Sequence, residues 1–189
     1  MSRKGNKKQW GNALPIHMVR CFIAVKLGEE IEAPLRELQN KAKQLDIDAS
    51  FPSDFHCTLA FLGELYEDQV EKTKERLEKL QLKQTQVEVK GVGFFPNGKF
   101  IRVFWAGVKG LDEMQNSIAK ALRHREEFLG HVTIARIKNP GNLSQLREIA
   151  KAYEEKEFGT TTISGVALFK SVLTAQGPQH EELFVKKLS

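Results

Sequence analysis

The sequence has few cysteines, no long apolar run and no glycine-rich phosphate loop, and each absence excludes a class of protein. Among 189 residues only Cys21 and Cys57 are cysteines, which is too few for a disulfide-stapled secreted scaffold and lacks metal-site spacing. We interpret both as buried free thiols in a reducing compartment. No segment approaches the ~20 apolar residues that span a bilayer, and no signal peptide follows the basic start. We therefore expect a cytoplasmic protein without membrane contact.

The composition itself is that of an ordinary globular domain. The chain is 41% apolar and 28% charged, with 29 Lys and Arg against 24 Asp and Glu, a net charge of +5 and a pI near 9.2. Its length fits one domain, and the basic excess favours a phosphate-bearing partner only weakly. Residues 1–17 carry four Lys and Arg and no acid. We predict that they form a disordered basic extension before a single bilobal domain at 18–189.

The hydrophobic pattern predicts strands and helices in alternation. Apolar residues at period two predict strands, and steps of three or four, as in Ile31, Leu35 and Leu38, predict helices. Strands are predicted at 19–25, 55–62, 86–94, 99–108, 129–137, 160–170 and 182–188, and helices at 31–45, 67–80, 111–122 and 143–153. A loop containing Gln176, Gly177 and Pro178 is predicted between the last two strands. This order favours an α+β fold of mostly antiparallel sheet with outer helices, rather than a doubly wound nucleotide-binding fold.

One short pattern occurs twice. HCTLA at 56–60 and HVTIA at 131–135 share His, Thr and Ala, and each lies on a predicted strand between two helices. Because residues i and i+2 of a strand point to the same face, each motif presents an imidazole beside a hydroxyl. Two pseudo-symmetric lobes of this kind would bring both pairs to one central groove.

Two imidazoles and two hydroxyls around a groove suit phosphodiester hydrolysis. Histidine has an ordinary pKa of about 6.5, so a neutral ring can take a proton from water while a charged ring protonates the leaving alkoxide. The hydroxyls of Thr58 and Thr133 can bind the non-bridging phosphate oxygens. The scheme needs no metal, and no cluster with ligand spacing is evident. A lone buried His is more often a core residue, but its repetition beside Thr favours function.

Other substrate contacts are less defined by the sequence. Arg102 and Arg136 are the cations that we expect near the groove, and a surface ion pair explains each about as well. Arg136 falls on the opposite strand face from Thr133 unless a bulge intervenes. Phe51 could stack a base, with core packing as the alternative. The remaining histidines lack a Thr partner and are interpreted as surface residues: His17, His124 and His180.

The paired motifs resemble the HxTx motifs of the 2H phosphoesterase superfamily. RCFIAV at 20–25, FFPNGKFIRVFWAGV at 94–108 and Gly177-Pro178 are similar to its RNA 2′,3′-cyclic phosphodiesterase branch, also called 2′-5′ RNA ligases. The resemblance covers about residues 18–188. Two departures stand out: His180 occupies a place where that family commonly has an aromatic residue, and FPSDF at 51–55 is not the usual sequence.

The resemblance implies hydrolysis of RNA 2′,3′-cyclic phosphate ends to 2′-phosphates, without metal or cofactor. It implies that His56 is the proton donor, His131 the proton acceptor, and Thr58 and Thr133 the phosphate-binding residues. RNA ends such as tRNA fragments are the implied partners, acted on by a monomer. The reverse step could join ends through a 2′-5′ linkage without ATP. Two alternatives stay open: a phosphodiesterase of small cyclic nucleotides, and a non-catalytic RNA-binding module, which has no need of two titrating imidazoles.

Overall fold

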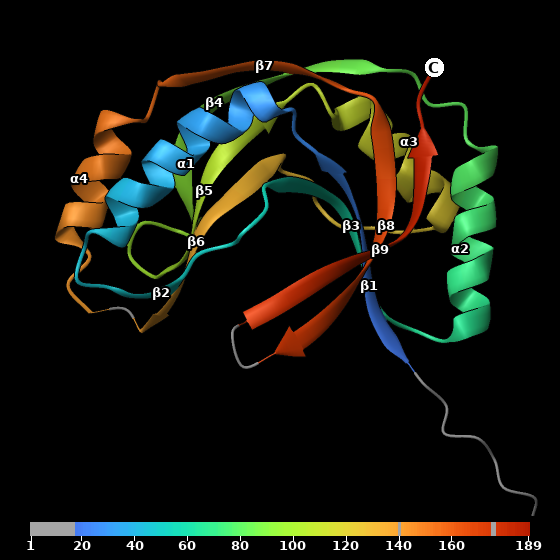
Figure 1. Cartoon of the computed structure of the whole chain (residues 1–189), viewed down its shortest axis with the longest axis horizontal. Coiled ribbons are helices and arrows are strands. Elements are labelled where there is room, and N and C mark those ends of the chain that lie inside the picture. Colours follow the sequence, from blue (N-terminus) through green and yellow to red (C-terminus); the bar gives the residue numbers. More distant parts are fainter. Residues whose placement is uncertain (1–17, 140, 175–176) are drawn as a thin grey trace, which may run out of the picture.

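The computed structural model describes residues 18–139, 141–174 and 177–189. The expected basic extension at 1–17, with His17, lies outside these ranges, as does Gln176. Within them, nine strands and four helices form the predicted α+β fold (Figure 1). In chain order the elements are β1 (Val19–Lys26), α1 (Glu29–Lys43), β2 (Asp48–Ser50), β3 (His56–Leu65), α2 (Glu67–Lys79), β4 (Thr85–Pro96), β5 (Ile101–Lys109), α3 (Asp112–Leu122), β6 (His131–Asn139), α4 (Ser144–Ala152), β7 (Glu157–Ile163), β8 (Gly165–Thr174) and β9 (Gly177–Lys187).

Three features differ from the predicted elements. The strand β2 is missing from the prediction because three residues are too short to show alternation. The single strand predicted at 160–170 is two strands, β7 and β8, which separate at Ser164. The last strand begins at Gly177 and not at residue 182, so Gly177 and Pro178 belong to β9 rather than to a loop. Proline is tolerated there because it stands at the start of an edge strand.

All strands join one antiparallel sheet with the order β7-β4-β5-β6-β3-β1-β8-β9, and β2 pairs with β6. The path divides into two halves of four strands, β6-β5-β4-β7 and β3-β1-β8-β9. Between the halves, β3 and β6 pair only at Cys57 and Val132. The two motif strands are therefore the inner strands of the two predicted lobes, and they meet at this junction.

Both motif strands carry a bulge directly after the motif Thr. In β3, Thr58 and Ala60 pair with consecutive residues of β1, which leaves Leu59 without a partner. In β6, Thr133 and Ala135 pair with consecutive residues of β5, which leaves Ile134 extra. A bulge places two successive side chains on one face and shifts the following alternation. Phe61 in β3 and Arg136 in β6, two residues after the bulged Leu59 and Ile134, therefore return to the face of the motif His and Thr.

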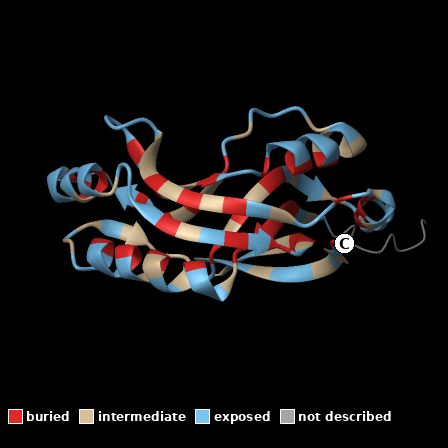
Figure 2. Ribbon diagram, turned by 90° about the horizontal axis from the view of Figure 1, so that it is seen from above, coloured by how far each residue is buried: buried red, intermediate tan, exposed pale blue. Residues whose placement is uncertain are grey.

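The helices cover the outer face of the sheet. Figure 1 shows α1 and α4 beside the half that contains β4, β5 and β6, and α2 and α3 beside the other half. The apolar stripe predicted for 31–45 is buried at Ile31, Leu35, Leu38 and Ala42. One buried cluster draws on both halves, and Figure 2 shows buried residues alternating with exposed ones along the strands. From this shared core we propose that the two lobes form one domain.

Candidate active site

The junction of β3 and β6 brings both motifs together. Cys57 and Val132, which pair across it, are fully buried, so the flanking His and Thr residues of each strand face the opposite side, where they are half-buried. Antiparallel pairing at this point sets His56 across from Thr133, and Thr58 across from His131. The two HxT pairs therefore face one another across the pseudo-two-fold axis.

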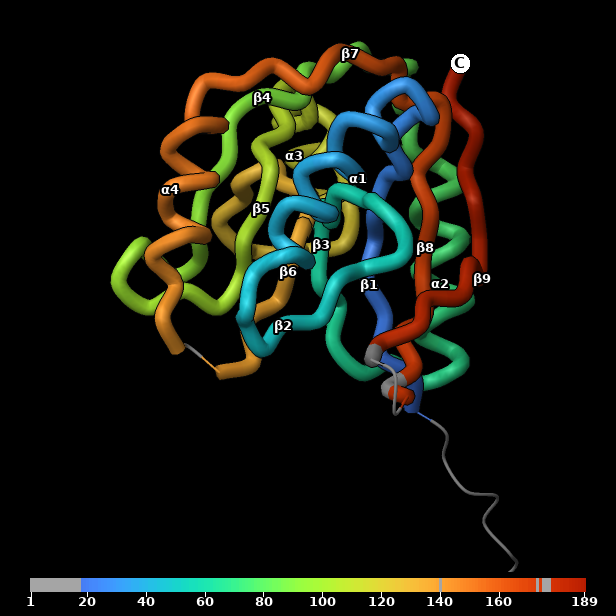
Figure 3. The backbone as a smooth tube through the Cα atoms, turned by 60° about the vertical axis from the view of Figure 1, so that its left-hand side comes forward, coloured from blue at the N-terminus to red at the C-terminus, as the bar shows by residue number. Residues whose placement is uncertain are grey.

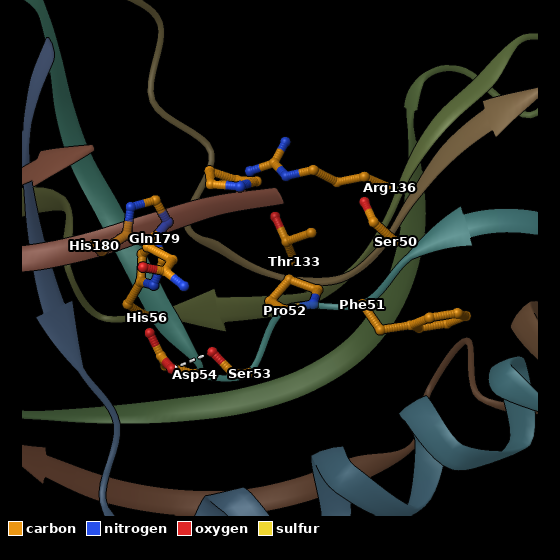
Figure 4. A pocket seen from close by; sticks show the side chains of 11 residues that line it. Ser50, Phe51, Pro52, Ser53, Asp54, His56, Thr133, Arg136, Gln179 and His180 are labelled. Atoms are coloured by element: carbon orange, nitrogen blue, oxygen red, sulfur yellow. Dashed lines mark hydrogen bonds between the residues drawn. The ribbon is translucent and has the colours of Figure 1, made fainter. Parts of the chain in front are cut away.

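A cavity of about 490 Å³ opens beside His56 (Figure 4). Its walls are the segment between β2 and β3, the two motif strands, and the start of β9, which come together from distant parts of the chain (Figure 3). The lining residues are Ser50, Phe51, Pro52, Ser53, Asp54, His56, Thr133, Arg136, Pro178, Gln179 and His180. Two residues of the motifs, Thr58 and His131, are both described in the structure but do not line this cavity.

His56 is the first residue of β3 and sits in an aromatic environment. Its ring centroid lies 5.3 Å from that of Phe22, 6.1 Å from that of Phe169 and 5.2 Å from that of His180. Burial lowers the pKa of His56 to about 4, and the charge of His180 adds to this, while Asp54 opposes it. The imidazole of the free protein is therefore neutral at neutral pH.

His131, the first residue of β6, is held differently. Its Nδ1 lies 2.8 Å from the carbonyl oxygen of Leu129, and a carbonyl only accepts, so Nδ1 carries the proton of the neutral ring and Nε2 keeps its lone pair. Phe95 and Trp105 flank the ring at centroid distances of 4.9 and 6.3 Å. Burial lowers the pKa of His131, with the Leu129 carbonyl acting in the opposite direction. The result is a neutral imidazole suited to accept a proton.

Arg136 reaches the cavity because of the bulge at Ile134. The extra residue, Ile134, returns the Arg136 side chain to the face of Thr133. Figure 4 shows the side chains of Thr133 and Arg136 in the cavity. Burial lowers the pKa of Arg136, but a guanidinium stays charged at neutral pH. A fixed positive charge thus lies beside a motif hydroxyl.

Of the other two candidates, Phe51 lines the cavity and Arg102 does not. Arg102 is exposed, and its Nη1 donates to the backbone oxygen of Lys138 at 2.9 Å. The ring of Phe51 extends away from His56 in Figure 4, packs against the core and lies under Lys43, whose Nζ is 5.6 Å from its centroid. Neither geometry presents the side chain to the motif histidines.

The interpretation of His180 as a surface residue is wrong. It lines the cavity and lies edge-on to both His56 and Phe22, the latter at 4.9 Å, and its Nδ1 is buried without a hydrogen-bond partner. Because β8 and β9 curl over the sheet, a residue near the end of the chain reaches the first motif, and no local pattern indicates this. His124 instead lies beyond α3, with Nε2 3.2 Å from Glu126.

The described residues contain neither a cluster suited to a metal nor a membrane-spanning helix. Within residues 18–139, 141–174 and 177–189, no group of three or more His, Cys, Asp or Glu is placed to hold a metal ion; metal independence remains a prediction. In the same ranges, no helix has the length and apolar character to span a membrane. Cys21 and Cys57 are buried and unpaired, as predicted.

The chain is similar to a phosphoesterase profile, to proteins named RNA 2′,3′-cyclic phosphodiesterase and to a solved structure. A profile described as "LigT like Phosphoesterase" matches residues 25–105. The RNA 2′,3′-cyclic phosphodiesterase of Methanocaldococcus jannaschii is 31% identical over 173 residues, which cover 86% of this chain and 97% of that protein. The Aquifex aeolicus protein of the same name is 33% identical over 176 residues, 85% and 93% of the two chains. The crystal structure of the Thermus thermophilus protein TT0787 has a TM-score of 0.73 at 28% identity, covering 89% and 97%.

Proposed function

This chain belongs to the LigT-like phosphoesterase family, and from that premise we propose that it hydrolyses RNA 2′,3′-cyclic phosphate ends to 2′-phosphates. The observation that carries the proposal is the junction of β3 and β6, where both HxT pairs face one side of the sheet beside a cavity. The cavity, at about 490 Å³, is in the size range of small-molecule sites. RNA 2′,3′-cyclic phosphodiesterase is also the name of the Methanocaldococcus and Aquifex relatives.

In the proposed mechanism His131 is the proton acceptor. Its Nε2 lone pair, left free by the bond of Nδ1 to Leu129, takes a proton from water as the water oxygen attacks phosphorus. The bond between phosphorus and the 3′ oxygen then breaks, and His56 gives that oxygen a proton. Thr133 and Arg136 in the cavity, with Thr58 across the junction, bind the non-bridging oxygens as their charge grows. The site residues supply each proton transfer, and we propose that no metal or cofactor takes part.

His56 must gain a proton before it can donate one. In the free protein burial holds its pKa at about 4, but a phosphodiester brings a negative charge against the ring, and a nearby opposite charge favours the imidazolium form. Asp54 acts in the same direction. We therefore propose that the bound substrate raises the pKa of His56, so that the ring gains the proton that it later gives to the leaving oxygen.

Product analysis tests the proposal. An oligoribonucleotide ending in a 2′,3′-cyclic phosphate is incubated with the protein, and the products are identified by mass and by their resistance to a 3′-specific phosphatase. We expect one added water and a 2′-phosphate. A 3′-phosphate product would contradict the assignment of the leaving oxygen, and unchanged RNA that is bound would favour the non-catalytic RNA-binding module.

The same assay separates the remaining alternatives. Faster turnover of small cyclic nucleotides than of RNA ends would favour the small-molecule phosphodiesterase, and a 2′-5′ joined product with an added 5′-hydroxyl strand would show the reverse step. We further propose a monomer that acts on RNA ends such as tRNA fragments in the cytoplasm. The two free buried cysteines fit a reducing compartment.

A further inference from the structure

Gln39 is a fully buried polar side chain beneath the candidate active site. It lies in α1, within the apolar stripe, and has no exposed surface. Burying an amide is unfavourable unless its hydrogen bonds are satisfied. The partners of Gln39 therefore show what the side chain holds in place.

Both N–H groups and the oxygen of this amide have partners. Nε2 donates to the carbonyl oxygen of Ile134 at 3.2 Å and to that of Pro52 at 3.0 Å. Oε1 accepts from Nη1 of Arg36 at 3.1 Å, and the same guanidinium donates to the carbonyl of Ser53 at 2.8 Å. Because a guanidinium only donates, the orientation of the amide is fixed.

The two carbonyls belong to two neighbouring segments of the cavity lining. Ile134 is the bulged residue of β6, between Thr133 and Arg136, both of which line the cavity. Pro52 is in the segment before β3, which follows the pairing of Ser50 with Arg136 and also lines the cavity. One amide thus joins the strand that carries the hydroxyl and the guanidinium to the loop beside it.

The same bond gives the carbonyl of the bulged residue a partner. An extra residue in a strand is left out of the ladder, and a buried carbonyl without a partner is costly. If the bulge were lost, the alternation after Ile134 would shift by one residue, which turns every following side chain to the other face. Arg136 would then leave the cavity.

The other lobe repeats the arrangement and provides a control. Gln115 in α3 is 5% exposed, and its Nε2 donates to the carbonyl of Leu59, the bulged residue of β3, at 3.4 Å. A buried amide on each bulge indicates that the bulge requires it. Gln115 makes no described bond to a wall of the cavity, which separates the two roles.

We propose that Gln39 is a positioning residue, which holds the bulge that turns Arg136 into the cavity, beside the loop that contains Pro52. The kinetic test rests on the proposed function, because it reads turnover of a cyclic phosphate. The inference that Gln39 positions Arg136 does not depend on the proposed activity, because it is argued from hydrogen bonds alone.

A double-mutant cycle between Gln39 and Arg136 tests this. Gln39→Met keeps the length of the side chain and removes the amide. We expect kcat/KM for a nucleoside 2′,3′-cyclic phosphate to fall by about 10- to 100-fold, the scale of a small misplacement, mostly through a higher KM, as in Arg136→Ala. In the double variant the Met substitution should add less than about twofold, because the guanidinium that Gln39 places is already absent.

The matched control is Gln115→Met, whose effect should multiply with that of Arg136→Ala because it supports the other strand. If Gln39→Met does not fold, Gln39→Asn, which keeps the donors but is too short for both carbonyls, enters the same cycle. Multiplying effects of Gln39 and Arg136, or wild-type kinetics in Arg136→Ala, would overturn the inference. An inactive wild-type protein would instead refute the proposed function, and the cycle would then be measured on the affinity for inorganic phosphate.

Discussion

The two motif strands share a backbone but differ in chemical environment. Each begins at its His, has a bulge after its Thr, and has a buried glutamine on the bulged carbonyl. Yet His56 packs against Phe22 and His180, with its pKa lowered to about 4, whereas His131 has its Nδ1 on the carbonyl of Leu129. The repeat therefore produces two histidines that are not equivalent.

We infer from this difference that the surroundings, and not the motif, set the proposed roles of the two histidines. The ring of His131 is oriented by a backbone acceptor and stays neutral, as a proton acceptor must. The ring of His56 has an acidic residue, Asp54, beside a second imidazole and a guanidinium, so its charge can respond to an arriving anion. Substitutions in the surroundings of one histidine at a time test this difference.

Removing either imidazole should have the largest effect. We expect His56→Ala and His131→Ala each to lower kcat on a cyclic phosphate by roughly 10²–10⁴-fold, the range for a general acid or base. The double variant should be little worse than either single variant, because the two groups act as a unit. His124→Ala, outside the cavity, serves as the control. Near-normal turnover in either site variant would remove that residue from the mechanism.

Removing the hydroxyls should distinguish the lobes. Valine keeps the shape and strand preference of threonine. Because Thr133 lines the cavity and Thr58 does not, Thr133→Val should lose about 10²–10³ in kcat, the scale of one oxyanion donor, and Thr58→Val less. Steady-state kinetics measure both. Equal losses would show that the phosphate sits on the axis between the lobes, and no loss in either would assign both hydroxyls to strand structure.

Removing the Asp54 charge should have a moderate effect through His56. Asp54 raises the pKa of His56, so Asp54→Asn should lower that pKa and reduce the protonated fraction at pH 7 by about two- to tenfold, since one pKa unit is tenfold. NMR titration of the His56 ring measures the shift, and kcat/KM should fall in proportion. Asp46→Asn removes the same charge from an exposed position and should change neither. An unchanged His56 pKa in Asp54→Asn would exclude this coupling.

Removing residues 1–17 should have the smallest effect, because the residues described within 18–189 include both HxT motifs and the cavity lining. We propose that a chain starting at Met18 folds and hydrolyses a dinucleotide cyclic phosphate at the wild-type rate. The basic segment could still strengthen binding to long RNA, in a manner that weakens with salt. A folded truncated chain with reduced dinucleotide turnover would contradict the domain boundary.

The sequence predicts what is local and misses what depends on distant contacts. The HxT pairs and the helix stripe are visible because their periodicity is set within a few residues. Gln39 follows Leu35 by one helical turn, so the stripe indicates its face, but a main partner of its amide, Ile134, comes 95 residues later and has no local signal. Likewise His180 reaches His56 only through the curl of β9, and the bulge that turns Arg136 inward has no signal in its own strand.

The most direct test of the unequal roles uses a substrate whose leaving group needs no proton. In an RNA end with sulfur in place of the 3′ bridging oxygen, a thiolate departs, and protonation by His56 becomes unnecessary. The account predicts that His56→Ala recovers most of its turnover on this substrate, while His131→Ala stays inactive because water must still lose a proton. Recovery of His131→Ala instead, with His56→Ala inactive, would contradict the assignment.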